Sequence, residues 1–406
     1  MITPACIGVY LRLQRRSSLD MMREAVIVSA VRSAIGKAHK GALVNVRIDD
    51  LGARVVREAL NRVPGLNPEE IEDVLIGCAT PEGEQGLNVA RAISFLARIP
   101  VTAAATTVNR FCGSSLQTIN FAAQAIMTGN GDVFVAGGVE SMSHVPMRGF
   151  NPSLNEKLLG EDYPDAYISM GMTAENLAEK YHISRQEQDE FALLSHQKAV
   201  TALRAGQFKQ EIVPVEVVLP DGSSRIFDTD EYPRADTSLE KLATLEPAFK
   251  QGGTVTAGNA SPLSDGAAAV VLMSRDKARE LGVKPLATIR AMAVAGVDPT
   301  LMGIGPVPAV QKVLKRARLT LEDMDVIELN EAFAAQSLAV IRELKIDLKK
   351  LNPRGGAIAI GHPLGATGAR IMATLVHEMM EMDARFGLET MCIGGGQGIA
   401  TIIERA

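Results

Sequence analysis

The sequence has little of what a nucleic-acid-binding protein needs. It contains no tryptophan, and aromatic residues make up only 4% of its 406 residues, so side chains that could stack on nucleobases are scarce. Its formal net charge is -5, and a chain of that sign does not attract polyanions by bulk charge. We therefore expect no nucleic-acid partner, and any phosphate-bearing ligand must bind to a local basic patch.

Cysteines are also few, and they lie far apart. Cys6, Cys78, Cys112 and Cys392 include no Cys-x-x-Cys pair and have no histidine at ligand spacing. This pattern argues against a zinc site and a disulfide framework, and it fits a reducing compartment. No apolar run approaches the ~18 residues of a membrane-spanning helix. We expect a soluble, cytoplasmic protein with no metal site and no membrane span.

Residues 1–21 differ from the rest of the chain. They carry three arginines but a single acid, Asp20, and they precede a strand-like start after Met22. One interpretation is a leader that is not part of the fold. The other is an organelle transit peptide, which would place the protein in an organelle matrix, although Pro4 and Gly8 weaken the amphipathic helix that such a peptide needs.

The chain is long enough for two or three domains at about 150 residues each. From Met22 to Gly138, short apolar runs alternate with segments of helical periodicity, which predicts alternating strands and helices. The expected strands are Ala25 to Ala30, Val74 to Ala79, Ala104 to Asn109 and Val133 to Gly137. The expected helices are Asp50 to Asn61, Gln85 to Ala97 and Ser114 to Thr128.

Residues 286–406 repeat this order. The last strand of the first half, Ala267 to Met273, comes only after a long insertion. The chain therefore predicts an α/β protein of two similar β-α-β-α-β-α-β-β halves. The expected strands of the second half are Thr288 to Gly296, Val326 to Leu329, Ala357 to Ile360, Thr390 to Gly394 and Ala400 to Glu404. Its expected helices are Val307 to Arg318, Glu331 to Leu344 and Ala366 to Met382.

The insertion between Glu140 and Ser264 is richer in charge and proline than the two halves. Helical patterns are expected in it at Thr173 to Tyr181 and Arg185 to Ala205, and we expect it to form a separate lobe over the duplicated core. The expected domains are an N-terminal half of residues 22–140 and 264–285, an inserted lobe of residues 141–263 and a C-terminal half of residues 286–406.

Cys112 and His362 occupy equivalent places in the two halves. Functional loops of such folds lie at the carboxyl ends of strands, next to helix N-termini, and the third expected strand of each half leads to one of these residues. A pseudo-two-fold axis between the halves would make them face one another. A helix N-terminus and a nearby imidazole should lower the pKa of the Cys112 thiol below about 8.5 and make it a nucleophile. Taken alone, Cys112 is more typical of a small buried hydrophobe.

His362 lies in a glycine-rich helix start that begins Gly361-His362-Pro363. The glycine spacing is not Gly-x-Gly-x-x-Gly and no acid follows at the ribose distance, so we do not expect a dinucleotide site. His362 is better placed as a general base. The other histidines are more typical of surface or packing residues, and they are His39, His144, His182, His196 and His377.

Further candidates lie at strand ends in the C-terminal half. Cys392 ends an expected strand before Gly394-Gly395-Gly396, which could form a plain turn or donate backbone N–H groups to an oxyanion. Asn330 ends another strand, where an asparagine is usually a helix cap. Each is ambiguous alone, but all converge with Cys112 and His362 on one edge of the duplicated sheet.

On these motifs the sequence resembles the thiolase family, specifically 3-ketoacyl-CoA thiolases and acetyl-CoA acetyltransferases, from about Met22 to Arg405. The resemblance implies the thiolase fold, with two similar halves in a five-layered α-β-α-β-α core and an inserted loop domain. The segments that carry it are Asn109-Arg110-Phe111-Cys112-Gly113-Ser114-Ser115, Gly137-Gly138-Val139-Glu140-Ser141-Met142-Ser143, Asn330-Glu331-Ala332-Phe333, Gly361-His362-Pro363, Cys392-Ile393-Gly394-Gly395-Gly396 and Thr254 to Ser261.

The resemblance implies acyl transfer through a covalent intermediate. Cys112 would take the acyl group of a 3-ketoacyl-CoA after giving its proton to His362. Asn330 and His362 would hold a water that stabilises the departing acetyl-CoA enolate, and Cys392 would protonate its carbon. The backbone N–H groups of Cys112 and Gly394 would form a second oxyanion hole. Coenzyme A would be a co-substrate, and no cofactor would be bound permanently.

The resemblance also implies residues that contact the substrate. Ser169 departs from the short-chain biosynthetic pattern, which has histidine there, and with the segment Cys78 to Gly86 it favours the degradative branch of fatty-acid β-oxidation. The alternatives are that Ser169 is a neutral change and that the enzyme is an acetyl-CoA C-acetyltransferase specific for acetoacetyl-CoA. The residues expected to contact coenzyme A or the acyl chain are Arg234, Phe249, Ala257, Ser261, Met170, Ala332 and Phe333.

Three other functions compete with this one. Decarboxylating ketoacyl synthases share the fold but use two histidines, and Asn330 and Cys392 argue against them. A non-catalytic acyl-CoA or lipid binder should have lost a polar site residue, and none is missing. A nicotinamide oxidoreductase would need a phosphate loop that the chain lacks. Since thiolases are typically homodimers or homotetramers, we expect such an assembly, and a hydroxyacyl-CoA dehydrogenase/enoyl-CoA hydratase is a further candidate partner.

Overall fold

The computed structural model describes residues 23–160, 163, 165–218 and 222–406. The expected leader, which includes Cys6, lies outside these residues. Among the helices of the described residues, none is both long and apolar enough to cross a membrane.

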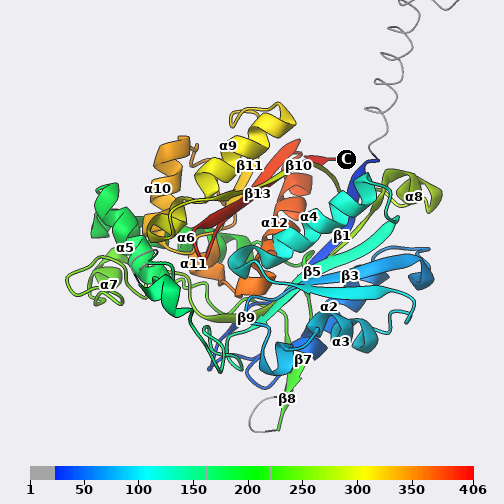
Figure 1. Cartoon of the computed structure of the whole chain (residues 1–406), viewed down its shortest axis with the longest axis horizontal. Coiled ribbons are helices and arrows are strands. Elements are labelled where there is room, and N and C mark those ends of the chain that lie inside the picture. Colours follow the sequence, from blue (N-terminus) through cyan, green and yellow to red (C-terminus); the bar gives the residue numbers. More distant parts are fainter. Residues whose placement is uncertain (1–22, 161–162, 164, 219–221) are drawn as a thin grey trace, which may run out of the picture.

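The strands of both halves join in one sheet (Figure 1). The N-terminal half has the order β4-β3-β5-β9-β1 and the C-terminal half the order β11-β12-β13-β10. The halves meet where β1 and β10 pair antiparallel, with Val26 opposite Thr288. The strands are β1 (Ala25–Ser33), β3 (Ile71–Gly77), β4 (Ala104–Val108), β5 (Val133–Ser141), β9 (Ser264–Ser274), β10 (Ala287–Gly296), β11 (Val326–Leu329), β12 (Phe386–Ile393) and β13 (Gln397–Arg405), with the short β2 (Gly36–Lys37) beside β9 and β6 (Ile212–Val213) beside β1.

The two halves share one topology. In the N-terminal half, β3 and β5 pair parallel, whereas β5 with β9 and β9 with β1 pair antiparallel. The C-terminal half repeats this scheme with β11 and β12 parallel, and with β12–β13 and β13–β10 antiparallel. The expected duplication is therefore visible in the strand pairing.

Helices form three layers around the two parts of the sheet. In Figure 1, α4 and α12 lie between the two parts, α2 and α3 lie outside the N-terminal strands, and α9 and α10 lie outside the C-terminal strands. This is the expected five-layered α-β-α-β-α core. The helices are α2 (Ile48–Asn61), α3 (Val89–Leu96), α4 (Ser114–Met127), α9 (Pro306–Ala317), α10 (Ala334–Leu344) and α12 (Thr367–Glu381).

The sequence of α4 explains its central place. Leu116, Ile119, Ala123 and Ile126 recur at helical spacing, and all four are fully buried. A helix that buries most of its surface belongs inside the core. It ends before Gly129, whose positive φ of 78° suits glycine. The N-terminus of α4, and Cys112 just before it, consequently lie deep in the molecule.

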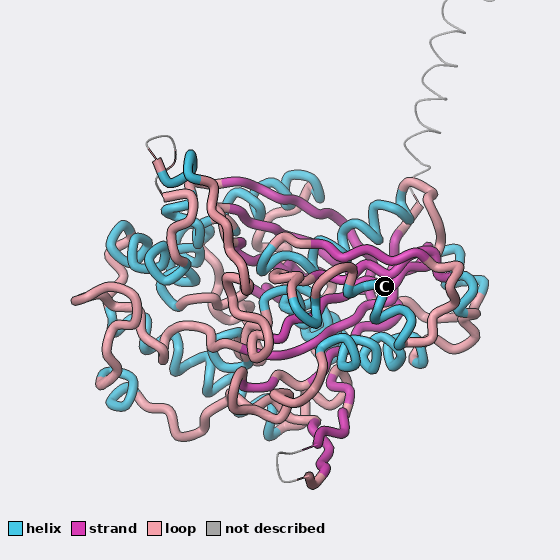
Figure 2. The backbone as a smooth tube through the Cα atoms, turned by 60° about the horizontal axis from the view of Figure 1, so that its bottom comes forward, coloured by secondary structure: helices cyan, strands magenta, loops and turns pink. Residues whose placement is uncertain are grey.

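The inserted lobe lies between β5 and β9 in the sequence and beside the core in space. Figure 2 shows strands gathered in one part of the molecule and loops with helices next to them. Buried ion pairs attach the lobe to the core, because Arg32 of β1 contacts Glu211 at 2.6 Å and Asp230 at 2.8 Å. The lobe contains α5 (Met170–Lys180), α6 (Arg185–Arg204), α7 (Leu239–Ala243) and the hairpin of β7 (Val215–Val218) and β8 (Ser224–Phe227). The remaining helices of the described residues are α8 (Arg275–Glu280) and α11 (Ala357–Ile360), with 3₁₀ turns at Pro68–Glu70, Gly83–Gln85, Phe111–Gly113, Glu156–Leu159, Pro299–Ile304 and Leu364–Ala366.

The prediction of a strand over Ala357 to Ile360 is wrong, because these residues form the single helical turn α11. A short apolar run does not distinguish a strand from a buried helical segment. In the C-terminal half, the place of a third strand is marked by one parallel bridge between Ile327 and Leu351. His362 is therefore preceded by a helical turn and then by one glycine, Gly361. It does not follow the end of a strand.

Other predicted elements are confirmed with shifted ends. The helix expected from Glu331 begins at Ala334, since Phe333 is held in a bridge with Ala260. The helix expected from Gln85 begins after Asn88, whose side chain accepts a hydrogen bond from the N–H group of Arg91 and caps the helix.

Candidate active site

Cys112 lies on a strained turn between β4 and α4. Phe111, the residue before it, has a positive φ of 43°, which is unfavourable for a side chain of that size. The Asn109 side chain holds this conformation, because its Oδ1 accepts from the Phe111 N–H at 2.9 Å and its Nδ2 donates to the Ala79 carbonyl at 3.0 Å. The turn presents the Cys112 thiol at the start of α4, as expected.

The glycines after Cys392 form the hairpin turn between β12 and β13, where Gly395 and Gly396 have positive φ values. The turn also faces Cys112, because the backbone N–H of Gly394 is directed at the Cys112 sulfur. The segment is therefore a turn, as the first interpretation had it, and the donation of its N–H groups to an oxyanion stays a prediction.

The expected low pKa of Cys112 is wrong for the resting site. The residue is only 8% exposed, and burial raises the pKa of its thiol to about 11 despite the N–H groups of Gly394 and of Cys112 itself. Removing the thiol from water disfavours the thiolate more than these donors favour it. Cys112 thus rests as a thiol and needs a base when it reacts.

His362 has the properties of that base. Its Nδ1 lies 2.7 Å from Thr367 Oγ1, whose hydroxyl donates to the Pro363 carbonyl at 2.8 Å. Thr367 can therefore only accept from Nδ1, which must carry the ring proton, so the lone pair of a neutral ring is on Nε2. Burial and the charge of Arg370 lower the pKa of His362 to about 3. The backbone N–H of His362 also donates to Ser264 Oγ at 3.0 Å.

Asn330 faces the reactive side of this histidine. Its Nδ2 lies 3.4 Å from His362 Nε2, and its backbone N–H donates to the Thr390 carbonyl at 3.0 Å. It does not cap α10, whose N-cap is Phe333. Asn330 Oδ1 is buried and has no hydrogen-bond partner among the residues that the structure describes, which is rare for a buried carbonyl. The oxygen is placed to accept from a water or a substrate beside His362.

Cys392 completes this group from the end of β12. It is fully buried in an apolar cluster with Met302, Ala332 and Phe333. Burial raises the pKa of its thiol, and proximity to Cys112 raises it further. The four polar residues expected at one edge of the sheet are therefore brought together, and all of them rest uncharged.

Several residues expected to contact the substrate adjoin this group. Phe249 and Phe333 meet edge to face, with ring centroids 5.9 Å apart, and the N–H of Ser261 donates to the Ala332 carbonyl at 2.9 Å. The sulfur of Met170 lies 3.7 Å from the position that a Cβ on Gly394 would take. These contacts connect the inserted lobe to the reactive cysteines.

Arg234 and Ala257 lie farther out, and both are exposed. Within the described residues, the Arg234 guanidinium forms no hydrogen bond or ion pair, so it is available to a ligand. The backbone N–H of Arg234 donates to His196 Nδ1 at 3.3 Å. Burial lowers the pKa of His196 to about 4, and the charge of Arg234 contributes. His196 is a packing residue, as expected, but it supports a candidate ligand contact.

Some functional neighbours were not identified from the sequence. Ser264 and Thr367 orient His362, and Asn109 fixes the turn before Cys112. Asn109 and Thr367 lie within five residues of Cys112 and His362, and this proximity in sequence is the feature that could have indicated them. Ser264 is distant in sequence, so no feature of the sequence indicates it.

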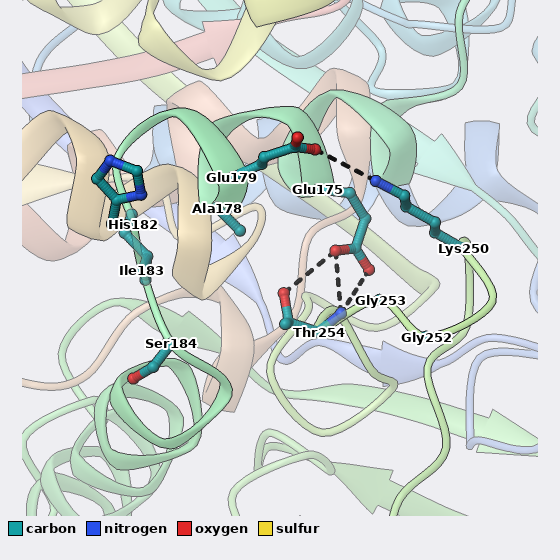
Figure 3. A pocket seen from close by; sticks show the side chains of 10 residues that line it. All are labelled: Glu175, Ala178, Glu179, His182, Ile183, Ser184, Lys250, Gly252, Gly253 and Thr254. Carbon is teal, nitrogen blue, oxygen red and sulfur yellow. Dashed lines mark hydrogen bonds and ion pairs between the residues drawn. The ribbon is translucent and has the colours of Figure 1, made fainter.

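A surface cavity of about 370 Å³ lies beside α5, and Figure 3 shows the residues that line it. The Glu175 carboxylate accepts from the backbone N–H of Thr254 at 2.9 Å and from that of Val255 at 2.8 Å. Glu179 pairs with Lys250 at 3.3 Å on the rim. The cavity contains none of the reactive residues, but its walls hold the segment that leads to Ser261. In the described part of the chain, no group of three or more His, Cys, Asp or Glu residues is suited to a metal ion.

The fold and site together define a duplicated α/β protein that brings together a buried cysteine, a neutral histidine and a second cysteine. Residues 25–276 match the family model of the thiolase N-terminal domain, and residues 283–405 match that of the thiolase C-terminal domain. The chain belongs to the thiolase family.

Its relatives cover nearly all of it. A 3-ketoacyl-CoA thiolase of Bacillus subtilis is 54% identical over 94% of this chain and its own full length, and one of Marinomonas sp. is 52% identical over 94% of this chain and 98% of its own length. Among solved structures, a Bacillus anthracis acetyl-CoA acetyltransferase has a TM-score of 0.87 and 44% identity, and human mitochondrial 3-ketoacyl-CoA thiolase has a TM-score of 0.88 and 40% identity. Both cover 95% of this chain and their own full length.

Proposed function

We propose that the protein is an acetyl-CoA C-acyltransferase that cleaves 3-ketoacyl-CoA with coenzyme A, giving acetyl-CoA and a shortened acyl-CoA in fatty-acid β-oxidation. The observation that carries this proposal is that the turn of Cys112, whose thiol the Gly394 N–H faces, contacts the turn that follows His362, a neutral histidine with its lone pair on Nε2. The relatives named 3-ketoacyl-CoA thiolase support the choice of substrate.

The first half-reaction forms an acyl-enzyme. Cys112 gives its proton to His362 Nε2, and its sulfur attacks the 3-keto carbon. The carbon–carbon bond then breaks, and the acetyl-CoA enolate that leaves takes a proton on carbon from Cys392. Asn330 and His362 hold the water that stabilises the enolate oxygen, and the N–H groups of Cys112 and Gly394 hold the oxygen of the acyl thioester.

The second half-reaction releases the acyl group. The coenzyme A thiol gives its proton to the Cys392 thiolate, and its sulfur attacks the Cys112 thioester. Cys112 leaves as a thiolate and regains its proton from His362, so both cysteines and the histidine return to their resting states. The reverse sequence is a Claisen condensation, and the kinetics are ping-pong.

Coenzyme A acts as a co-substrate in this proposal, and no permanently bound cofactor is needed. Arg234 is the local positive charge for its phosphates or adenine in a chain with a net charge of -5. Phe249, Ala257 and Ser261 form the path inward, and Met170, Ala332 and Phe333 line the pantetheine and acyl region. The contacts between Phe249 and Phe333 and between Ser261 and Ala332 support a continuous path.

A second candidate is an acetyl-CoA C-acetyltransferase specific for acetoacetyl-CoA. The similarity to the Bacillus anthracis acetyl-CoA acetyltransferase favours it. Ser169, which precedes α5, stands where short-chain biosynthetic thiolases have a histidine, and this departure favours the degradative enzyme instead. Rates of coenzyme A-dependent cleavage across short to long 3-ketoacyl-CoAs decide between the two: we expect activity beyond four carbons, and strict preference for acetoacetyl-CoA would contradict it.

The assembly we propose is a homodimer or homotetramer in the cytoplasm, with an organelle matrix as the alternative if residues 1–21 are a transit peptide. Within the described residues, β4 pairs on one side only, with β3, and nearby Leu87 is fully exposed. An exposed edge strand is a template for pairing with a second copy. A hydroxyacyl-CoA dehydrogenase/enoyl-CoA hydratase is a further proposed partner. Sedimentation of the purified protein measures the number of copies.

Trapping the acyl-enzyme tests the main proposal. Brief exposure to acetyl-CoA or acetoacetyl-CoA should add one acetyl group to Cys112, which peptide mass spectrometry detects. Bound acyl-CoA with an unmodified Cys112 would support a non-catalytic binder and contradict the enzyme proposal.

A further inference from the structure

A buried carboxylate, Glu140 near the end of β5, contacts both halves of the molecule. It is 1% exposed. Its Oε2 accepts from the backbone N–H of Ala79 at 2.7 Å and from that of Gly365 at 2.7 Å. Its Oε1 accepts from the N–H of Thr80 at 3.2 Å and from Gln85 Nε2 at 2.7 Å. One side chain thus joins the end of β3 to the loop that follows His362.

The packing leaves little freedom around Gly365. A Cβ on Gly365 would lie 2.6 Å from the Cys78 Cα and 2.7 Å from Glu140 Oε2, and one on Gly138 would lie 2.2 Å from the Gly365 carbonyl oxygen. The loop after His362 is therefore docked directly on the backbones of β3 and β5. Gly365 lies between His362 and Thr367, so a hydrogen bond that fixes Gly365 also fixes the ring and the residue that orients it.

Gln85 supports Glu140 but does not reach the histidine loop. It is fully buried, its Nε2 also donates to the Thr80 carbonyl at 2.7 Å, and its Oε1 accepts from the Ser141 N–H at 3.0 Å. All of its hydrogen bonds remain within the N-terminal half. Glu140 therefore carries the connection between the halves at this point, and the backbone N–H groups of Ala79 and Thr80 hold its carboxylate independently of Gln85.

All four nitrogen partners of Glu140 are donors, so a carboxylate that only accepts matches them best. An amide at this position offers one acceptor oxygen, and its NH₂ group would face N–H donors in place of the second carboxylate oxygen. Hydrogen bonds from several fixed donors to one ionised group are strong and directional, which suits a clamp between two loops.

We propose that Glu140 is a positioning residue that clamps the loop of residues 363–366 against the N-terminal half and so holds the His362 ring in place for Cys112. This inference rests on the proposed function of His362 as the base for Cys112. Glu140 acts through the loop and does not touch the substrate.

Glu140→Gln tests the clamp. Because small displacements of a catalytic group cost on the order of 10²-fold in rate, we expect kcat for thiolysis and the rate of Cys112 acylation to fall by about that factor. KM for coenzyme A should stay near the wild-type value, since its proposed contacts lie elsewhere. Hydrogen exchange of a peptide covering residues 361–367 should become faster. Glu140→Asp, which keeps the charge but shortens the reach, should fall between wild type and Glu140→Gln.

Gln85→Met is the matched control, because it removes buried hydrogen bonds from the same cluster without touching Gly365. We expect it to lower stability while keeping kcat and the exchange of residues 361–367 near wild type. Wild-type kcat and exchange in folded Glu140→Gln and Glu140→Asp would overturn the clamp. If the wild-type protein does not cleave 3-ketoacyl-CoA, the proposed function is refuted. Hydrogen exchange then tests the clamp separately, and unchanged exchange of residues 361–367 in Glu140→Gln would refute it.

Discussion

The loops before α4 and α12 occupy equivalent places in the two halves, yet they are built differently. The N-terminal loop follows strand β4 and stores strain at Phe111, which has a positive φ without being glycine. The C-terminal loop follows the helical turn α11 and bends at Gly361, which has a φ of 116°. A strained turn thus presents Cys112, whereas a loop that bends at a glycine presents His362.

Burial acts on the two reactive side chains in opposite directions. It raises the pKa of the Cys112 thiol to about 11 and lowers the pKa of the His362 imidazole to about 3. Both groups are therefore uncharged at neutral pH, unlike a preformed thiolate and imidazolium pair. The difference between the loops has a consequence: the cysteine is held by its backbone, but the histidine depends on the hydrogen bonds that it donates to Ser264 and Thr367 and, as we propose, on Glu140.

Removing the nucleophile should have the largest effect. Cys112→Ala leaves no group to carry the acyl chain, so we expect kcat for thiolysis to fall on the order of 10⁴-fold or more. Steady-state rates with a 3-ketoacyl-CoA and coenzyme A measure this. Ser29→Ala is the matched control, since Ser29 is also buried but lies in β1, outside the reactive group, and it should keep kcat near wild type. Equal losses in the two variants would contradict the proposed role of Cys112.

The same comparison shows what the sequence could predict. The alternation of apolar runs identified nearly every strand and helix of both halves, because their periodicity is strong. The strand predicted over Ala357–Ile360 is wrong, since a run of four apolar residues fits a strand and a buried helical turn equally well. Cys112, His362, Cys392 and Asn330 were correctly grouped, but the pKa of Cys112 was not, because burial depends on tertiary packing. Ser264 is about a hundred residues from His362 in sequence and contacts it only in the fold.

Crowding the contact between α4 and α12 should destabilise the whole core. A Cβ on Gly368 would lie 2.3 Å from the backbone nitrogen of Leu116, so the helices must separate. We expect Gly368→Ala to lower the free energy of unfolding by about 3 kcal/mol, measured by urea denaturation. Gly129→Ala, at a glycine with a φ of 78° and open space around it, should cost only about 1 kcal/mol. If Gly368→Ala lowers the free energy of unfolding less than Gly129→Ala does, the packing of α4 against α12 does not hold the loops that precede these two helices.

The smallest expected effect concerns the pH dependence of stability. The ordinary pKa of histidine is 6.5, whereas that of buried His362 is about 3. Between these values the unfolded chain binds a proton at this residue and the folded protein does not, so stability falls as the pH drops through this window. From about pH 7 to about pH 5, His362 should account for about 2 kcal/mol of the loss. In His362→Gln, which has no proton to bind there, the stability curve should be flatter by that amount, while the other titrating groups contribute equally to both proteins. Parallel curves for wild type and His362→Gln in denaturant titrations would mean that folding leaves the pKa of His362 near its ordinary value of 6.5, and burial would then not act on this residue as it does on Cys112.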